Sequence, residues 1–358
     1  MKGPGLGLEI RDVPEPELAP GEALLSIELS EVCGTDVHLS HGRLAGVPYP
    51  LVPGHVSVGR LAKIRGRMRD VDGGTLSEGD AVTFLDVHGT CNSCWYCLVA
   101  KASTRCPARK VYGITYGLAD GLTGGWAETL HLKQGTRVIA LAGSGFEHFM
   151  TGGCALPTAI HTLDRAEIRL GESVLVLGSG PVGLVTAILA RACGAQRVLV
   201  IGAPRHRLDT ALAVGADAVL DFTENDAADR QAWVMANTDG RGADVTLEAS
   251  GDPRAPVQAL RWTRDAGRVV VSGQYTDGGD TSFNPHRDVN KKHIEIRGTW
   301  GSDYSHFHRA VRWMADPARS APFAHLPRAR FGLSSATEAL AAVQSGAVVK
   351  ALIDPRLD

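Results

Sequence analysis

The chain of 358 residues lacks a surplus of charge of either sign, because 37 Lys and Arg face 39 Asp and Glu. The resulting net charge of −2 gives no general attraction to nucleic acid or to an anionic membrane, so we expect neither as a partner. The first residues, MKGPGLGLEIRDVPEPE, lack the apolar run of a signal peptide, and we therefore expect a cytoplasmic protein. The apolar stretch 173–190 contains three glycines and a proline, which favours a strand, a turn and a helix over a membrane span.

Three catalytic motifs are also absent. The sequence contains no G-x4-G-K-[ST] phosphate-binding loop, no HExxH metal-binding helix and no G-x-S-x-G nucleophile turn. No motif in the sequence therefore supports phosphoryl transfer or serine hydrolysis.

The chain divides into two regions by its hydrophobic pattern. Apolar runs that predict strands alternate with helix-like segments at 182–193 and 207–214. These runs lie at 174–177, 197–201, 218–222, 245–249, 268–272 and 294–297. Such alternation predicts an α/β fold with a doubly wound parallel sheet, and six strands complete a dinucleotide-binding sheet.

The rest of the chain has a different pattern. Extended runs separated by Pro, Gly and Asp clusters predict a mostly antiparallel β-domain. These runs lie at 22–29, 59–64, 80–84 and 127–132. Near the end of the chain, residues 334–344 predict a helix and residues 348–353 a final strand.

Four of the seven cysteines are clustered, with the spacing Cys91-x2-Cys94-x2-Cys97-x8-Cys106. Thiolates at x2 spacing in a turn can converge on one tetrahedral ion, so this spacing favours a structural zinc site in a lobe at about residues 88–110. Disulfides, which are rare in chains without a secretion signal, and an iron–sulfur cluster are the alternatives. A site closed by four sulfurs is expected to stabilise the lobe and to do no chemistry.

Two further cysteines lie in suggestive surroundings that spacing does not unite. Cys33 opens the run CGTDVH, and Cys154 lies in GGCALPTAIH, just before the α/β region. His55 lies in PGH, before a predicted strand. Taken alone, each cysteine is better explained as a small core residue than as a ligand.

The run VLVLGSGPVG (174–183) combines an apolar strand, a glycine-rich turn and the start of a helix. Such glycines permit a tight turn and let backbone N–H groups approach a pyrophosphate at the helix N-terminus. The candidate coenzyme-binding residues of this turn are Gly178, Gly180, Pro181, Val182 and Gly183.

The position that selects between NAD and NADP is unusual. About twenty residues after the turn, NAD enzymes normally place Asp or Glu against the adenosine ribose. Here Gly202 stands at that position, and Arg205 and Arg207 follow. Loss of the acid and gain of arginine favour NADP, because the guanidinium fork binds phosphate. The alternative is that both arginines are solvated and that the enzyme uses NAD or either coenzyme.

These motifs, taken in order, resemble the zinc-containing medium-chain dehydrogenase/reductase (alcohol dehydrogenase) family. The resemblance covers nearly the whole chain and extends to GGWAE (124–128), GTWG (298–301) and SGAVVK (345–350). It implies a GroES-like catalytic domain in residues 1–154, a Rossmann domain inserted at 155–297 and a return to the catalytic domain at 298–358. It also implies a homodimer or homotetramer.

The resemblance assigns roles to single residues near the expected active site. It implies that Cys33, His55 and Cys154 bind a catalytic zinc, and that the four clustered cysteines bind a second zinc. By the same likeness, Thr35 takes the proton of the substrate and His38 passes it to solvent. In the family a carboxylate at the position of Asp36 orients the zinc-binding histidine.

Further matches concern the coenzyme and the substrate. Thr158 and Val182 match residues that pack against the nicotinamide, and Lys350 matches a basic residue near the pyrophosphate. Trp126 and Trp300 fall where the family lines its substrate cleft, with two ordinary core aromatics as the alternative.

The chain departs from the family pattern at three places. Val56 follows His55 where the family usually has Glu, which puts the exchange of the fourth zinc ligand in doubt. The last gap of the cysteine lobe is eight residues, where seven is usual. The third departure is the missing acid at Gly202.

These assignments imply a zinc-dependent, NAD(P)-linked alcohol dehydrogenase that acts on a small-molecule alcohol or carbonyl, and a secondary or cyclic alcohol is expected. The alternatives are a carbonyl reductase in biosynthesis and a sugar, polyol or cyclitol dehydrogenase. Cys154 weighs against the polyol branch, which often uses glutamate as third zinc ligand. A nucleotide-binding protein without catalytic activity is the remaining alternative.

Overall fold

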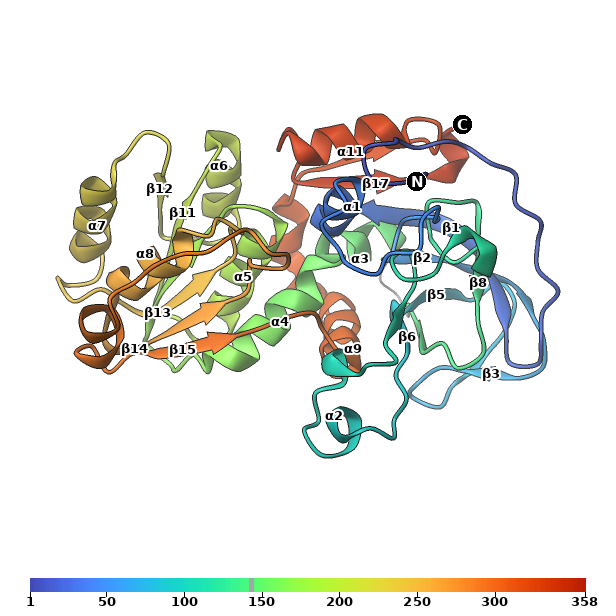
Figure 1. Cartoon of the computed structure of the whole chain (residues 1–358), viewed down its shortest axis with the longest axis horizontal. Helices are drawn as coiled ribbons and strands as arrows, with labels where there is room; N and C mark the ends of the chain where they lie inside the picture. The colour runs from blue at the N-terminus through green and yellow to red at the C-terminus, as the bar shows by residue number, and fades with distance from the viewer. Residues whose placement is uncertain (142–144) are drawn as a thin grey trace. The chain divides into compact units, whose positions relative to one another are not determined.

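In the computed structural model, which describes residues 1–141 and 145–358, the chain forms two compact units (Figure 1). The first unit comprises Met1–Cys154, Asp303–Ser320 and Pro327–Asp358. The second comprises Ala155–Ser302 and Ala321–Leu326. The boundary expected after residue 297 thus falls after Ser302, and a short later segment belongs to the second unit.

The first unit is built on a mostly antiparallel sheet, as expected for a GroES-like domain. Its strand order is β16-β17-β1-β2-β5-β9, with β8 also paired to β1, and among these strands only β16 and β17 run parallel. The strands are β1 (Ala23–Val32), β2 (Ser57–Ile64), β5 (Ala81–Phe84), β8 (Thr129–Leu132), β9 (Val138–Ala140), β16 (Arg328–Phe331) and β17 (Lys350–Ile353). Two small ribbons accompany them, β3 (Met68–Arg69) with β4 (Thr75–Leu76) and β6 (Val87–Gly89) with β7 (Lys110–Val111).

Strand β1 organises this unit because it pairs with three other strands. Its side chains at Ala23, Leu25 and Ile27 alternate into the core, where they meet side chains of β2, β5 and β8. The strand continues past its expected end at residue 29 because its last residues pair with β17. This extension brings the end of the chain against the segment that leads to Cys33.

The helices of the first unit lie around this sheet. They are α1 (Gly34–Ser40), α2 (Trp95–Leu98), α3 (Phe146–Gly152), α9 (Tyr304–Met314), α10 (Pro317–Ser320) and α11 (Ala336–Gln344). Single 3-10 turns occur at Ser103–Arg105, Leu118–Asp120 and Pro355–Leu357. Helix α11 packs against β17 through an apolar cluster that also holds Val32 of β1.

The second unit is the expected doubly wound parallel sheet. Its strand order is β12-β11-β10-β13-β14-β15, with every pair parallel. The strands are β10 (Ser173–Leu177), β11 (Arg197–Gly202), β12 (Ala218–Asp221), β13 (Ala243–Glu248), β14 (Thr263–Val271) and β15 (Glu295–Gly298). Each predicted strand is present, and β14 begins earlier than predicted.

Helices accompany the strands of the second unit. They are α4 (Ala155–Ala166), α5 (Pro181–Ala192), α6 (Arg205–Ala213), α7 (Ala227–Ala236) and α8 (Ala255–Trp262), with a π-helix at Pro285–Asn290 and a 3-10 segment at Ala321–His325. Helix α5 contacts both α4 and α6, whereas α7 contacts α8. Within the described ranges, no helix combines the length and the apolar character needed to cross a membrane.

Candidate active site and metal centres

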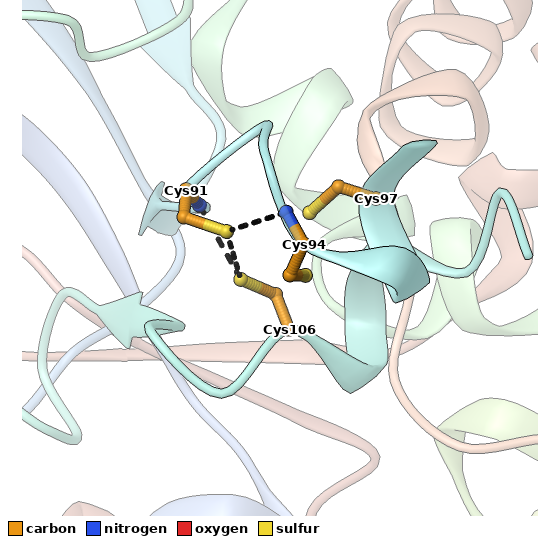
Figure 2. A group of neighbouring side chains, drawn as sticks. All are labelled: Cys91, Cys94, Cys97 and Cys106. Carbon is orange, nitrogen blue, oxygen red and sulfur yellow. Dashed lines mark hydrogen bonds between the residues drawn. The ribbon is translucent and has the colours of Figure 1, made fainter. Parts of the chain in front are cut away.

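The clustered cysteines converge in the lobe between β6 and β7. Figure 2 shows their side chains turned toward a common centre, and all four sulfurs lie within 4.8 Å of one another. The sulfurs of Cys91 and Cys106 are 3.6 Å apart, and the amide of Cys94 donates to the Cys91 sulfur at 3.3 Å. A hydrogen bond from the backbone of Ser93 lowers the pKa of Cys91 to about 6, which favours the thiolate form that binds metals. Four sulfurs in this arrangement fit a closed zinc site.

The other three expected ligands also meet, although they come from distant parts of the first unit. Cys33 precedes α1, His55 lies in the turn before β2, and Cys154 follows α3. Their ligand atoms lie within 4.8 Å of one another. His55 Nε2 lies 3.6 Å from the sulfur of Cys33 and 3.4 Å from that of Cys154. Two sulfurs and one imidazole nitrogen fit a zinc ion that keeps one coordination position open.

The electrostatics of this group concentrate negative charge on one sulfur. A hydrogen bond from the Cys154 thiol, together with the charge of His55, holds the pKa of Cys33 well below its usual value. Burial lowers the pKa of His55, but the neighbouring Cys33 thiolate outweighs burial and raises it to about 10. A buried thiolate of this kind is an appropriate ligand for a cation.

The expected relay residues lie on α1, directly after the first ligand. Cys33 is the N-cap of this helix, and its sulfur accepts a hydrogen bond from the amide of Thr35 at 3.4 Å. Thr35 and His38 are three residues apart, a spacing that places side chains on the same face of a helix. His38 is half-buried, and burial lowers its pKa below the ordinary value of 6.5.

The geometry around Asp36 shows a capping bond and, within the described residues, no hydrogen bond to His55, so its orienting role stays a prediction. One carboxylate oxygen of Asp36 accepts the amide of Cys33 at 2.9 Å and caps α1. The other oxygen and His55 Nδ1 are both buried and lack a hydrogen-bond partner among the described residues. Capping fixes the carboxyl group on its own helix. Burial raises the pKa of Asp36 to about 8.

Lys350, for which a place near the coenzyme pyrophosphate stays a prediction, is enclosed within the first unit. Its side chain is 1% exposed, and its ammonium donates to Glu31 Oε1 at 2.5 Å and to the carbonyl of Gly152 at 3.1 Å. The charge of Lys350 is therefore already balanced by a buried carboxylate.

In the second unit the glycine-rich turn lies where the sequence places it. Strand β10 ends at Leu177, Gly180 is the N-cap of α5, and Pro181 occupies its first turn. Half-buried Val182 follows in that turn. The N-terminus of α5 thus directs unpaired backbone N–H groups toward the turn, which suits a pyrophosphate.

The missing acid at position 202 has a steric counterpart. Gly202 ends β11, and a Cβ atom there would lie 2.4 Å from the hydroxyl oxygen of Ser179. That hydroxyl donates to the carbonyl of Ala203 at 2.9 Å and ties the glycine-rich turn to the loop after β11. A carboxylate side chain at position 202 would therefore require this contact to move.

The two arginines expected to select the coenzyme are in different surroundings. Arg205 is exposed and pairs with Asp209 at 2.9 Å, one turn along α6. Arg207 is half-buried, and burial lowers its pKa. Of the two, Arg205 has the accessible guanidinium.

The two tryptophans do not share a site within either unit. Trp126 is 5% exposed and belongs to the core beside α11, and its indole N–H donates to the carbonyl of Glu31 at 3.1 Å. Its burial fits the alternative of an ordinary core aromatic, and a place in the substrate cleft stays a prediction. Trp300 and Thr158 belong to the second unit and are half-buried. The ring of Trp300 stacks on Tyr275, with centroids 5.6 Å apart.

Three residues near these sites were missed from the sequence, namely Glu31, Ser179 and Tyr275. Glu31 left a signal, because it is an acid near the end of a strand that leads to Cys33. Ser179 and Tyr275 left none, since their contacts depend on loops after β11 and β14.

Comparison with known proteins matches both units. The family described as the alcohol dehydrogenase GroES-like domain matches residues 19–143, and that described as zinc-binding dehydrogenase matches residues 181–316. The chain is 30% identical over 353 residues to 5-exo-hydroxycamphor dehydrogenase of Pseudomonas putida, covering 98% of this chain and 96% of that protein. It is 28% identical to D-arabinitol dehydrogenase 1 of Uromyces fabae, covering 82% and 79% of the two proteins.

Solved structures agree with these relatives. An alcohol dehydrogenase from Thermotoga maritima superposes with a TM-score of 0.92 at 30% identity, covering 99% of this chain and 97% of that one. A zinc-binding dehydrogenase from Sinorhizobium meliloti bound to NADP superposes with a TM-score of 0.82 at 25% identity, covering 96% and 95%.

Proposed function

Because the chain belongs to the zinc-containing medium-chain dehydrogenase/reductase family and is a zinc-dependent alcohol dehydrogenase, we propose that it oxidises secondary or cyclic alcohols reversibly with a nicotinamide coenzyme. The observation that carries this proposal is the convergence of Cys33, His55 and Cys154 within 4.8 Å. The Pseudomonas relative supports the substrate class, because it is named for 5-exo-hydroxycamphor, a cyclic alcohol.

The proposal includes two zinc ions per chain with different roles. Cys33, His55 and Cys154 would hold the catalytic ion, and the four clustered cysteines would hold the structural one. When bound, the catalytic zinc supplies a Lewis acid that favours loss of the hydroxyl proton from an alcohol.

The residues of α1 would then carry the proton away. The Thr35 hydroxyl accepts the proton of the substrate hydroxyl and passes its own proton toward His38. His38 is neutral at pH 7 because burial holds its pKa below 6.5, so it can accept that proton and deliver it to solvent. When bound, the nicotinamide would supply C4 as the acceptor of the hydride that the alcohol carbon gives up on oxidation.

For the coenzyme we propose NADP. Gly202 lacks the carboxylate that would repel a 2′-phosphate. A carboxylate side chain at position 202 would also collide with Ser179. Arg205 is exposed, and its present partner Asp209 is held only by an exposed ion pair, which a phosphate can replace at little cost. The NADP bound to the Sinorhizobium protein supports this choice. Arg207, half-buried on the same helix, would add positive charge.

A polyol dehydrogenase is the second candidate. It is favoured by the relative named for D-arabinitol. Against it stands Cys154 as the third ligand, where the polyol branch often has glutamate.

The test combines metal analysis with coenzyme reduction across a panel of alcohols. We expect about two zinc ions per chain. We also expect faster reduction of NADP than of NAD, and higher kcat/KM for cyclic secondary alcohols than for primary alcohols, arabinitol or threonine. Fastest turnover of arabinitol would favour the second candidate. Full zinc content without turnover of any alcohol or carbonyl, in either direction, would overturn the enzymatic proposal.

A further inference from the structure

An ion pair lies buried directly beside the three-ligand group. Glu31 on β1 is 2% exposed and Lys350 on β17 is 1% exposed, and they meet from positions 319 residues apart in the sequence. Removing two charges from water costs several kcal/mol per ion, and a buried pair often contributes no more stability than apolar residues of similar volume. Stability alone therefore does not account for this pair.

The pair binds the main chain on both sides of Gly153, directly before the third ligand. Glu31 Oε2 accepts the amide of Cys154 at 2.6 Å, and Lys350 Nζ donates to the carbonyl of Gly152 at 3.1 Å. Gly153 between them has a φ of +46°, and a Cβ atom there would lie 2.0 Å from Glu31 Oε2 and 2.9 Å from Lys350 Nζ. The run GGC (152–154) thus folds around the two charged groups, and position 153 has no space for a side chain.

The same glutamate is connected to the other two ligands. Glu31 precedes Cys33 by two residues on the extended end of β1. Its backbone amide donates at 2.9 Å to the carbonyl of Val56, the residue after His55. Glu31 is therefore linked to all three ligand segments. It is joined to Cys33 through the chain, and it forms hydrogen bonds with Cys154 and with Val56.

We propose that Glu31, held by Lys350, is a positioning residue of the catalytic metal site and fixes the direction of the Cys154 sulfur. The inference rests on the proposed function, because it takes Cys154 as a zinc ligand. The charged pair specifies one arrangement: the carboxylate has one oxygen for Lys350 and one for the Cys154 amide. An apolar pair of the same volume would fill the space without fixing the amide.

Zinc release to a colorimetric chelator tests this proposal without a measurement of activity. The variants are Glu31→Gln, which keeps the shape and removes the charge, and Lys350→Met. Their matched control is Glu172→Gln, which breaks the buried Glu172–Arg268 pair of the second unit. Cys154→Ala identifies the release phase that belongs to the three-ligand site. We expect both test variants to release that zinc about 10- to 100-fold faster than wild type, the usual effect of removing a partner that orients a ligand.

Two comparisons make the outcome decisive. Release of the lobe zinc should be unchanged in all variants, and Glu172→Gln should release both ions as wild type does. Replacing zinc by Co²⁺ gives a second readout, because its visible absorption bands should shift in Glu31→Gln and stay unchanged in Glu172→Gln.

If Glu31→Gln does not fold, the pair Lys350→Arg and Lys350→Met decides, since arginine retains the charge and should keep release near the wild-type rate. Wild type without zinc at Cys33, His55 and Cys154 would contradict the proposed function itself. Zinc that is present in wild type and released at the same rate from Glu31→Gln as from Glu172→Gln would overturn only the positioning role.

Discussion

The two cysteine-containing groups of the first unit are assembled in opposite ways. The ligands of the lobe lie in one short segment, residues 91–106, and range from exposed Cys91 to buried Cys106. The ligands of the other group come from residues 33, 55 and 154, and its histidine is 3% exposed. The lobe can form its site locally, whereas the three-ligand site exists only when the sheet of the whole unit is in place.

On the proposed assignment, this difference separates a stabilising site from a reactive one. A closed set of four sulfurs can hold an ion but offers no position to a substrate, and its segment gains order from the ion. A set of three ligands fixed by the fold needs no ion to hold its segments together. The fold positions it, and it can keep a position open for chemistry.

The largest expected effect comes from Cys154→Ala. Loss of one of three ligands should remove the catalytic zinc and reduce kcat to background, while the far-UV circular dichroism and the lobe zinc stay as in wild type. Steady-state kinetics and metal analysis measure both. Cys193→Ala is the matched control, because this exposed cysteine ends α5 in the second unit and should keep full activity. Retention of two zinc ions by Cys154→Ala would contradict the ligand assignment.

Cys97→Ala should have the converse effect. Opening the lobe site should lower stability by on the order of 3 kcal/mol, or about 6–12 °C in Tm if the first unit melts as a domain of ordinary size. kcat measured well below the transition should change little. A variant with an unchanged Tm and one zinc fewer would show that the lobe ion is not structural.

A change that leaves both groups intact sharpens the distinction further. His38→Gln should slow alcohol oxidation about tenfold near pH 7, less than the about 10²- to 10⁴-fold effect of a base that acts on substrate directly. Because the pKa of His38 is lowered, wild-type oxidation should fall only below about pH 6.5, as the imidazole gains a proton. As the pH is lowered, the oxidation rate of the variant should begin to fall at a higher pH than that of the wild type. Imidazole buffer should partly restore the rate of the variant. His41→Gln, at the end of the same helix, is the control. Identical pH–rate profiles would show that the proton leaves by another route.

The smallest expected effect lies in the second unit, which contains neither cysteine group. Arg205→Ala should lower kcat/KM for NADP by about fivefold, or about 1 kcal/mol, and leave the value for NAD unchanged. Arg241→Ala is the control, because Arg241 also forms an exposed ion pair, with Asp239, before β13. A wild type that favours NAD tenfold, or unchanged NADP kinetics in the variant, would refute the coenzyme assignment.

Local patterns in the sequence identify much of this molecule. The strands of the parallel sheet are buried on both faces, so their apolar runs are continuous and their positions are predicted within a few residues. The lobe cysteines can be identified from the sequence equally well, because their short spacing along the chain brings the four sulfurs together. The three-ligand group cannot be predicted from spacing, because its members are far apart in the sequence. Only the family resemblance united Cys33, His55 and Cys154.

The contacts that the sequence did not predict include one that spans the chain and one that is local. The pairing of Lys350 with Glu31 could not be predicted, because nothing local shows that the two residues meet across paired strands. The capping bond from the Cys33 amide to Asp36 was not predicted, because the family resemblance relates Asp36 to His55. At Val56 the glutamate usual in the family is missing. The structure nevertheless places another carboxylate close by, that of Glu31 on β1, which contacts Cys154.

The pairing of β1 with β17 has a consequence for the order in which the protein is made. A ribosome that has synthesised Cys33, His55 and Cys154 must still produce all of Ala155–Ser302 before Lys350 emerges. The largely continuous second unit can acquire its parallel sheet during that interval, because domains generally fold as units as the chain grows. During that interval the lobe can already bind its ion, whereas Glu31 cannot yet pair with Lys350. The reactive centre is therefore expected to mature last, after translation has passed residue 350, and unfinished chains should contain one metal ion fewer than finished ones.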